Sequence, residues 1–195
     1  MEIESLVSFV SGSGPLIIAG PCSAESEEQV MAIAMALKAT GRVHLLRAGV
    51  WKPRSRPSSF GGEGVRALAW LQRAKEETGL PLAVEVASPV HVEACLKHGI
   101  DMVWLGARTV SNPFSVDEIA RALQGTSLPV LVKNPLGPDV DLWLGAIERV
   151  YDAGIRRIAG LHRGYTPYSK GKHCNLPKWE LEIDMIRRVP ALSVI

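Results

Sequence analysis

Short apolar runs of strand length alternate with amphipathic stretches of helix length along the whole chain. Strict alternation of this kind is typical of a parallel sheet whose strands are joined by right-handed helical crossovers. The runs are apolar on both faces, as expected of parallel strands that are covered on both sides. The expected strands are residues 16–20, 43–49, 82–87, 102–107, 130–133, 158–163 and 192–195. The expected helices are residues 26–40, 64–78, 89–98, 115–123, 139–153 and 177–188.

Two α/β architectures fit this alternation, an open doubly wound sheet and a closed TIM (β/α)8 barrel. The open sheet usually binds nucleotides through a glycine-rich first turn, but residues 21–25 are Pro-Cys-Ser-Ala-Glu. A barrel spreads its site over many strand ends, which suits this sequence better. We therefore expect a TIM barrel, of which this chain covers about seven strands and six helices. A complete barrel typically needs about 250 residues. We therefore expect an incomplete aldolase-type barrel domain at residues 15–195, preceded by a lead-in at residues 1–14.

Composition narrows the class of protein. The 195 residues are 47% hydrophobic and carry a net charge of +2, which fits one globular domain with an ample core. Lysine and arginine form no long stripe, so the sequence argues against nucleic-acid binding. No apolar stretch reaches the ~18 residues of a membrane span. Three cysteines, an odd number, and no signal peptide favour a reducing, cytoplasmic location.

Cations follow four of the apolar runs. If the runs are parallel strands, their carboxyl ends lie at one rim, so cations distant in sequence converge on one pocket. Arginine suits bidentate binding of carboxylate or phosphate, and lysine adds a movable charge and a possible proton. Such a cluster predicts a ligand of charge about −3, for example a phosphorylated carboxylic acid. The cations are Arg47, Arg108, Lys133 and Arg163, at the ends of the second, fourth, fifth and sixth expected strands.

A second cationic segment, residues 52–62, forms a long loop after the second expected strand. Its prolines stiffen it, while its hydroxyls, arginines and glycine amides can face a second phosphate. The alternative is a solvated basic surface loop. Glu85, inside the third expected strand, would be unfavourable without a partner, so we expect it to face the rim and pair with a cation. Any single cation of the set could also have a structural role, pairing with a carboxylate or capping a helix, and not bind a ligand.

Cys22 ends the first expected strand at the same rim. A lone cysteine is most often a small buried side chain. Its position also admits a nucleophile, for which His162 is the only histidine at a strand end, or a metal ligand. Cys95 and His98 lie within an expected helix and are interpreted as packing residues.

Together these segments resemble the 3-deoxy-7-phosphoheptulonate (DAHP) synthases, in their short single-barrel type I-beta subfamily. The matching motifs occur in the family's order and span almost the whole chain. They are Ala-Gly-Pro-Cys-Ser at 19–23, Leu-Arg-Ala-Gly at 46–49, Lys-Pro-Arg-Ser at 52–55, Gly-Ala-Arg-Thr at 106–109, Lys-Asn-Pro at 133–135 and His-Arg-Gly at 162–164.

The resemblance implies an enzyme that condenses phosphoenolpyruvate with erythrose 4-phosphate and water and releases phosphate, the first step of the shikimate pathway to aromatic amino acids. Lys133 would also be the candidate proton donor, and Cys22 would be one of four ligands to a divalent metal, manganese or another transition metal. The implied phosphoenolpyruvate site is Arg47, Lys52, Glu85, Ala107, Arg108, Lys133 and Arg163. The implied erythrose 4-phosphate site is Lys52, Pro53, Arg54 and Ser55.

The family's other metal ligands, a histidine in an Asp-Pro-Ser-His-like segment, a glutamate and an aspartate, would lie beyond Ile195. We therefore expect an incomplete metal site and little or no turnover by a 195-residue chain alone. The resemblance further implies a homo-oligomer and a possible chorismate mutase domain or partner.

Three alternatives differ in substrate or class. The 3-deoxy-octulosonate 8-phosphate synthases carry an Ala-Asn-Arg-Ser-Ser type loop where residues 52–55 stand here, so the loop favours erythrose 4-phosphate. A sialic-acid-type synthase fits less well, because its acceptor sugar is not phosphorylated. A non-catalytic barrel fragment that docks to a partner such as chorismate mutase is the alternative from another class.

Overall fold

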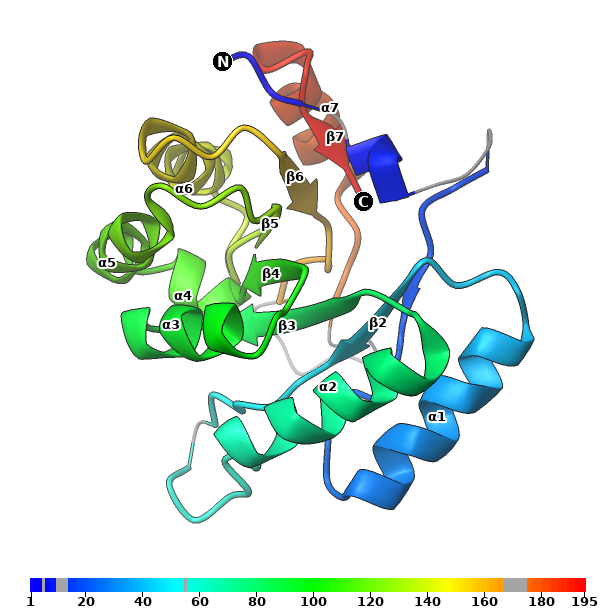
Figure 1. The fold of residues 1–195 in the computed structure, drawn as a ribbon. Coiled ribbons are helices and arrows are strands. Elements are labelled where there is room, and N and C mark those ends of the chain that lie inside the picture. Colours follow the sequence, from blue (N-terminus) through cyan, green and yellow to red (C-terminus); the bar gives the residue numbers. More distant parts are fainter. Residues whose placement is uncertain (5, 10–13, 55, 167–174) are drawn as a thin grey trace. The chain divides into compact units, whose positions relative to one another are not determined.

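The computed structural model describes residues 1–4, 6–9, 14–54, 56–166 and 175–195. In this part of the chain, seven strands follow one another through the sheet in chain order, separated by helices (Figure 1). The strands are β1 (Ile18–Ala19), β2 (Leu45–Ala48), β3 (Leu82–Val86), β4 (Met102–Leu105), β5 (Val130–Lys133), β6 (Ile158–Leu161) and β7 (Ser193–Val194). The sequence prediction of seven parallel strands alternating with helices is confirmed.

All six predicted helices are present, and polar side chains begin several of them. Ser26 precedes α1, and its hydroxyl accepts a hydrogen bond from the Gln29 amide at 3.1 Å. Asp139 caps α6 in the same way, by accepting from the Leu142 amide at 2.9 Å. The helices are α1 (Glu27–Ala39), α2 (Val65–Thr78), α3 (Pro89–Lys97), α5 (Pro113–Leu123), α6 (Val140–Asp152) and α7 (Trp179–Arg188).

Two short helices were not predicted, a 3-10 helix η1 (Leu6–Phe9) and α4 (Ala107–Val110). Helix α4 corrects the predicted end of the fourth strand, which was expected to reach residue 107 and ends at Leu105. Gly106 is extended and caps α4, and the Val110 amide bonds to the Gly106 carbonyl at 2.9 Å, which closes a helical turn directly after β4. Arg108 therefore lies in a helix and not at a strand end.

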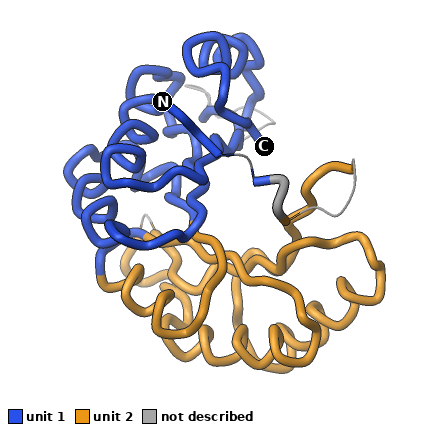
Figure 2. The backbone as a smooth tube through the Cα atoms, turned by 45° about the horizontal axis from the view of Figure 1, so that its top comes forward, with its two compact units in different colours: residues 1–6, 87–89, 104–195 blue, residues 7–86, 90–103 orange. Residues whose placement is uncertain are grey.

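The chain divides into two compact units (Figure 2). Unit 1 consists of Met1–Leu6, Ala87–Pro89 and Trp104–Ile195, and unit 2 consists of Val7–Val86 and Val90–Val103. In unit 2, β1 pairs with β2 and β2 pairs with β3, all parallel. In unit 1, β5 pairs with β6 and β6 pairs with β7, also parallel.

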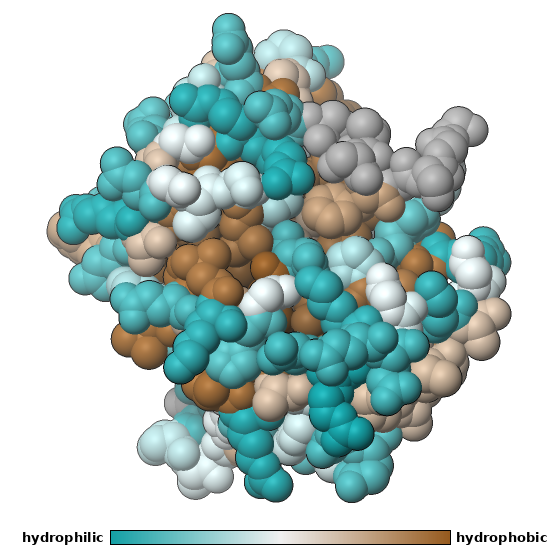
Figure 3. Space-filling model, viewed as in Figure 1, coloured by the Kyte–Doolittle hydropathy of each residue, from teal (hydrophilic) through white to brown (hydrophobic). Residues whose placement is uncertain are grey.

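Each unit buries an apolar core between its strands and helices. In unit 1 the indole of Trp143 is fully buried, packs against Gly160 and donates to the Val132 carbonyl at 2.9 Å. In unit 2, α2 buries Leu68 and Leu71, while hydrophilic side chains cover its outward face (Figure 3). None of the described helices is both long and apolar enough to span a bilayer.

Candidate functional site

Three of the predicted cations, Arg108, Lys133 and Arg163, belong to unit 1. Lys133 is the last residue of β5, and its ammonium nitrogen lies 5.2 Å from the centre of the Trp104 ring. Arg163 follows β6 and is half-buried, whereas Arg108 is exposed. Burial, and then the like charge of Arg108, lower the pKa of Arg163 below its usual range. Two guanidinium groups of unit 1 thus repel each other, and a bound anion would relieve that repulsion.

Side chains from two other segments fix the residue that carries this arginine. The buried amide of Asn134 accepts a hydrogen bond from the Arg163 backbone N–H at 2.7 Å. The Arg163 guanidinium itself donates to the Asn175 side-chain oxygen at 2.5 Å. Sequence reasoning included Asn134 only as the middle residue of the 133–135 motif and did not predict this contact.

A buried polar cluster adjoins Arg163 in unit 1. His162 Nδ1 contacts a carboxylate oxygen of Glu182, and the His162 and Trp179 rings lie 5.1 Å apart. Burial raises the pKa of Glu182 above its usual 4.5, although the attraction of His162 opposes the shift. Burial and the same carboxylate also raise the pKa of Tyr165. The imidazole that sequence reasoning considered as a partner for a nucleophile therefore already contacts a carboxylate.

The predicted cations of unit 2 contact backbone carbonyl oxygens. Arg47, in β2, donates to the Pro21 carbonyl at 3.1 Å. The Lys52 ammonium donates to the Cys22 carbonyl and lies 3.6 Å from the Cys22 sulfur. Lys52 and Cys22, predicted to share a site, are thus brought into direct contact. Arg54 is exposed, and its Nε donates to the Phe60 carbonyl at 2.9 Å.

Two motif glycines allow this close backbone packing. Gly20 has a φ of +151°, and a Cβ there would collide with the Arg47 carbonyl. A Cβ on Gly49 would overlap the Lys52 ammonium and the Cys22 carbonyl. Gly20 therefore makes room for the backbone of Arg47, and Gly49 makes room for the charged group of Lys52.

The basic loop after β2 is held at its base. The Lys52 amide donates to the Gly61 carbonyl at 2.7 Å, which joins the two ends of the loop. Just before it, the Trp51 ring stacks on His91 of α3, with ring centres 3.9 Å apart and planes inclined by 6°. Pro53 is exposed on the same loop, and Ser55 lies outside the described residues.

The remaining predicted site residues lie on three elements. Glu85 is half-buried on β3, and Ala107 is the buried first residue of α4. The Cys22 side chain is exposed, unlike the small buried side chain that a lone cysteine most often is. Cys95 is fully buried, which confirms its packing role, and burial raises the pKa of its thiol to about 12.

No group of three or more His, Cys, Asp or Glu side chains that could hold a metal ion is found among the residues that the structure describes. Cys22 is one soft donor, and a transition metal in a protein typically needs three or more protein ligands. The described residues therefore do not fit a complete metal site.

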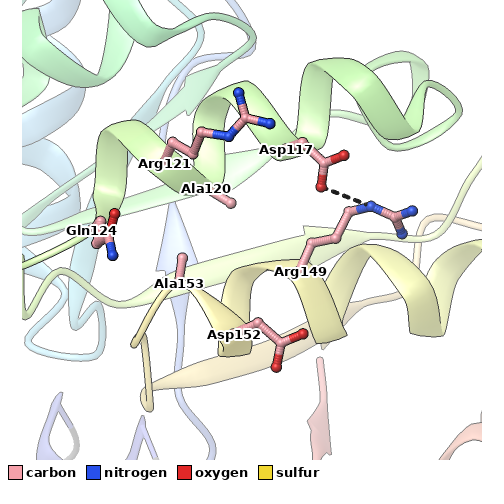
Figure 4. A pocket seen from close by; sticks show the side chains of 7 residues that line it. All are labelled: Asp117, Ala120, Arg121, Gln124, Arg149, Asp152 and Ala153. Atoms are coloured by element: carbon pink, nitrogen blue, oxygen red, sulfur yellow. Dashed lines mark ion pairs between the residues drawn. The ribbon is translucent and has the colours of Figure 1, made fainter.

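A separate hollow of about 260 Å³ lies between α5 and α6 in unit 1 (Figure 4). Arg149 and Asp117 in its wall form an ion pair at 2.9 Å, which neutralises the charge of this arginine (Figure 4). None of the predicted cations lines it. We therefore place the candidate site at the motif residues and not in this hollow.

Comparison with known proteins decides the family. The model of the DAHP synthetase I family matches residues 3–178, which is most of the chain. The chain belongs to the DAHP synthetase I family. The resemblance drawn from the sequence motifs is thereby confirmed. Enzymes of this family are generally metal-dependent.

Curated relatives of this DAHP synthetase I chain include two kinds of aldolase. A phospho-2-dehydro-3-deoxyheptonate aldolase of Thermotoga maritima is 30% identical over 154 residues, covering 79% of this chain and 44% of that protein. A 2-dehydro-3-deoxyphosphooctonate aldolase of Nitratidesulfovibrio vulgaris is 36% identical over 157 residues, covering 76% of this chain and 55% of that protein. The chain thus spans about half the length of the curated relatives it matches.

Solved structures agree with this family assignment. The crystal structure of the Thermotoga maritima DAHP synthase superposes with a TM-score of 0.77 at 27% identity, over 92% of this chain and 49% of that chain. A truncated form of the 3-deoxy-D-arabino-heptulosonate 7-phosphate synthase from the same organism gives a TM-score of 0.74 at 26% identity, over 92% of this chain and 62% of that chain. The predicted TIM-barrel fold class is confirmed.

Proposed function

We propose that this chain carries substrate-binding residues of a 3-deoxy-7-phosphoheptulonate synthase, the enzyme that joins phosphoenolpyruvate to erythrose 4-phosphate. The observation that carries the proposal is the pair of mutually repelling arginines in unit 1, Arg108 and Arg163, on motifs of the DAHP synthetase I family. A site that stores such repulsion is suited to a multiply charged anion.

Phosphoenolpyruvate is the anion that fits unit 1 best. It carries a phosphate and a carboxylate, and each suits the planar fork of an arginine. Lys133 ends the neighbouring strand β5 and adds a third positive charge. We assign Arg108, Lys133 and Arg163 to phosphoenolpyruvate, with Ala107 beside them at the start of α4. The family resemblance also implies Arg47 and Lys52, from the 46–49 and 52–55 motifs, and Glu85 of β3 as proposed phosphoenolpyruvate ligands.

The basic loop of unit 2 suits the phosphate of erythrose 4-phosphate. Arg54 is exposed and bonds to a carbonyl oxygen that a phosphate oxygen can replace as acceptor. Lys52 and Pro53 complete the described part of the proposed subsite, and Ser55 is its fourth proposed member. Because the loop is tied at Lys52 and Gly61, its residues present their polar groups from a fixed base.

The reaction needs charge stabilisation and one proton transfer from this chain. Carbon 3 of phosphoenolpyruvate forms a bond to the aldehyde carbon, and Lys133 is proposed to donate the proton that the aldehyde oxygen takes up. This leaves positive charge at carbon 2, to which water adds with loss of one proton, which restores the proton that Lys133 gave. The bond between carbon 2 and its phosphate oxygen then breaks, the remaining hydroxyl proton passes to the departing phosphate, and a ketone is left. The arginines would stabilise the phosphate and carboxylate charges throughout.

Calorimetric titration of the 195-residue chain with phosphoenolpyruvate tests the proposal. We expect one binding event that disappears in the double variant Arg108→Ala/Arg163→Ala. Arg121→Ala removes an exposed arginine from α5 of the same unit and should bind as the wild type does. Absence of phosphoenolpyruvate binding by the wild type would refute the assignment.

The acceptor sugar is tested separately, because one curated relative is a 2-dehydro-3-deoxyphosphooctonate aldolase. Erythrose 4-phosphate and arabinose 5-phosphate are titrated into the chain saturated with phosphoenolpyruvate. We expect the four-carbon sugar to bind more tightly. Tighter binding of the five-carbon sugar would assign the chain to the octulosonate reaction instead.

Family membership extends the proposal to the whole protein. We propose a divalent metal, manganese or another transition metal, with Cys22 as one ligand; Cys22→Ser should then weaken manganese binding. We also propose a cytoplasmic location, which the cysteine count favours, and, as the family resemblance implies, a homo-oligomer with a possible chorismate mutase domain or partner. Light scattering of the purified chain, alone and mixed with chorismate mutase, measures both associations.

A further inference from the structure

The amide of Asn134 is fully buried and makes three hydrogen bonds, all to backbone groups. Its oxygen accepts from the Arg163 N–H at 2.7 Å. Its nitrogen donates to the Gly164 carbonyl at 3.0 Å and to the Pro135 carbonyl at 2.9 Å. The opposite orientation of the amide would set an oxygen against two carbonyl oxygens, so these contacts admit only one orientation.

This residue links the ends of two neighbouring strands. Asn134 directly follows Lys133, the last residue of β5, and its backbone N–H donates to the Leu161 carbonyl at the end of β6 at 3.1 Å. Together with the side-chain bonds, it ties the segment 161–164 to the end of β5. Lys133 and Arg163, two proposed phosphoenolpyruvate cations, are therefore fixed in register through one buried side chain.

Arg163 needs such a restraint. Arg163 is half-buried, and burial lowers the pKa of its guanidinium most, with the like charge of Arg108 adding to the shift. A guanidinium on a loose segment would move away from that charge and toward solvent, where it would no longer share a ligand with Lys133. The bond from the Arg163 N–H to Asn134 opposes that movement at the backbone.

We propose that Asn134 is a positioning residue for phosphoenolpyruvate, acting through Arg163 and Lys133. The inference rests on the proposed function of unit 1 and adds a specific role to it. Asn134 sets the spacing of two cations that must bind the two charged ends of one ligand. Loss of the amide should therefore reduce the preference for phosphoenolpyruvate over inorganic phosphate, which needs no fixed spacing.

The test compares Asn134→Ala with Thr78→Val, a matched control that also removes buried side-chain hydrogen bonds. Thr78 is 4% exposed, and its hydroxyl donates to the Ala74 carbonyl at 2.6 Å and accepts from the Leu80 amide at 3.2 Å. It belongs to α2 in unit 2 and to none of the family motifs. Both variants should lose thermal stability, but only the first should change anion preference.

Calorimetry gives the dissociation constants of phosphoenolpyruvate and inorganic phosphate for each variant. In Asn134→Ala we expect the ratio of the two affinities to fall about ten-fold, with little change for inorganic phosphate. In Asn134→Ser, whose hydroxyl can replace one of the lost bonds, the fall should be smaller. Thr78→Val should keep the wild-type ratio.

Four outcomes separate the proposed function from the positioning role. If the wild type does not bind phosphoenolpyruvate, the proposed function fails. If the wild type binds it and Asn134→Ala keeps the wild-type ratio, the positioning role is refuted while the function stands. The positioning role is also refuted if Thr78→Val loses the ratio equally. If Asn134→Ala does not fold, Asn134→Ser replaces it in the test. A wild-type ratio of phosphoenolpyruvate to phosphate affinity in Asn134→Ser would then refute the positioning role and leave the proposed function standing.

Discussion

The cations of unit 1 and those of unit 2 are held in different ways. In unit 1, the buried amide of Asn134 holds the backbone of Arg163. In unit 2, Lys52 and Arg54 place their own charged groups on carbonyl oxygens of the chain. An anion must replace acceptors of the chain at both units: the Asn175 oxygen at Arg163 in unit 1, and carbonyl oxygens at Lys52 and Arg54 in unit 2. At unit 1 it would in addition relieve the repulsion between Arg163 and Arg108, and it meets an arginine whose backbone is already held, so we expect unit 1 to bind its ligand more tightly.

The largest expected effect would come from Arg163→Ala. Removing charge-assisted hydrogen bonds to a phosphate or carboxylate costs about 3 kcal/mol, so affinity for phosphoenolpyruvate should fall about 100-fold by calorimetry. Arg54→Ala removes the same charge from the loop of unit 2 and should leave this affinity within about two-fold of the wild type. Equal losses in the two variants would abolish the proposed difference between the units.

The second effect concerns the backbone of unit 2. In Gly20→Ala, the new methyl group meets the Arg47 carbonyl at a φ of +151°, which should lower the free energy of unfolding by about 2 kcal/mol. Urea denaturation measures the change. Gly61→Ala is the matched control in the same unit, because no atom lies within 4 Å of the place its new methyl group would occupy. Similar stability of the two variants would contradict the tight packing of β1 against β2.

A smaller effect concerns the binding of erythrose 4-phosphate, as distinct from that of phosphoenolpyruvate. Arg54→Ala should weaken the binding of erythrose 4-phosphate about ten-fold, since one charge-assisted bond is lost from an exposed site. Arg66→Ala, which removes an exposed arginine of α2 paired with Glu63 at 3.6 Å, should leave it unchanged. If Arg54→Ala instead weakened phosphoenolpyruvate more than the sugar phosphate, the assignment of the loop would be wrong.

The smallest effect is a pH dependence of folding stability that comes from Glu182, in the buried polar cluster beside Arg163. Because burial raises the pKa of Glu182 above 4.5, the unfolded chain releases this proton at lower pH than the folded chain does. The wild type should therefore lose stability relative to Glu182→Gln as pH rises above 4.5 toward the raised pKa. Urea titrations at several pH values measure the difference. A difference that stays flat or grows in the opposite direction would show that the attraction of His162 outweighs burial.

Periodicity in the sequence predicted all seven strands and the six longer helices, because the inner strands and the helices bury apolar residues; β1 and β7, at the ends of the sheet, are only partly covered. It did not predict α4, since four residues are too few to show a helical period. That omission misplaced Arg108, which the sequence assigned to the end of a strand. The first strand was also predicted longer than Ile18–Ala19, although the same apolar run contains it.

The sequence predicted the charged residues of the candidate site but not the hydrogen bonds that hold them in place. Motif residues identified Arg163 and Lys133, but the contact between Asn134 and Arg163 joins residues 29 positions apart and depends on the pairing of β5 with β6. The burial of Glu182 was equally hidden, because an acidic residue in an amphipathic helix is normally solvated. Contacts that depend on tertiary pairing leave no periodic signal in the sequence.

The position of Lys133 over the Trp104 ring gives the chain an optical reporter of its own. The ammonium lies 5.2 Å from the ring centre, and Trp104 is only 5% exposed, so solvent contributes little to its environment. An anion that draws the ammonium away would change the electric field at the indole and therefore its fluorescence. Ligand binding in unit 1 can thus be followed without a label, and Trp104→Phe identifies which part of the signal belongs to this ring.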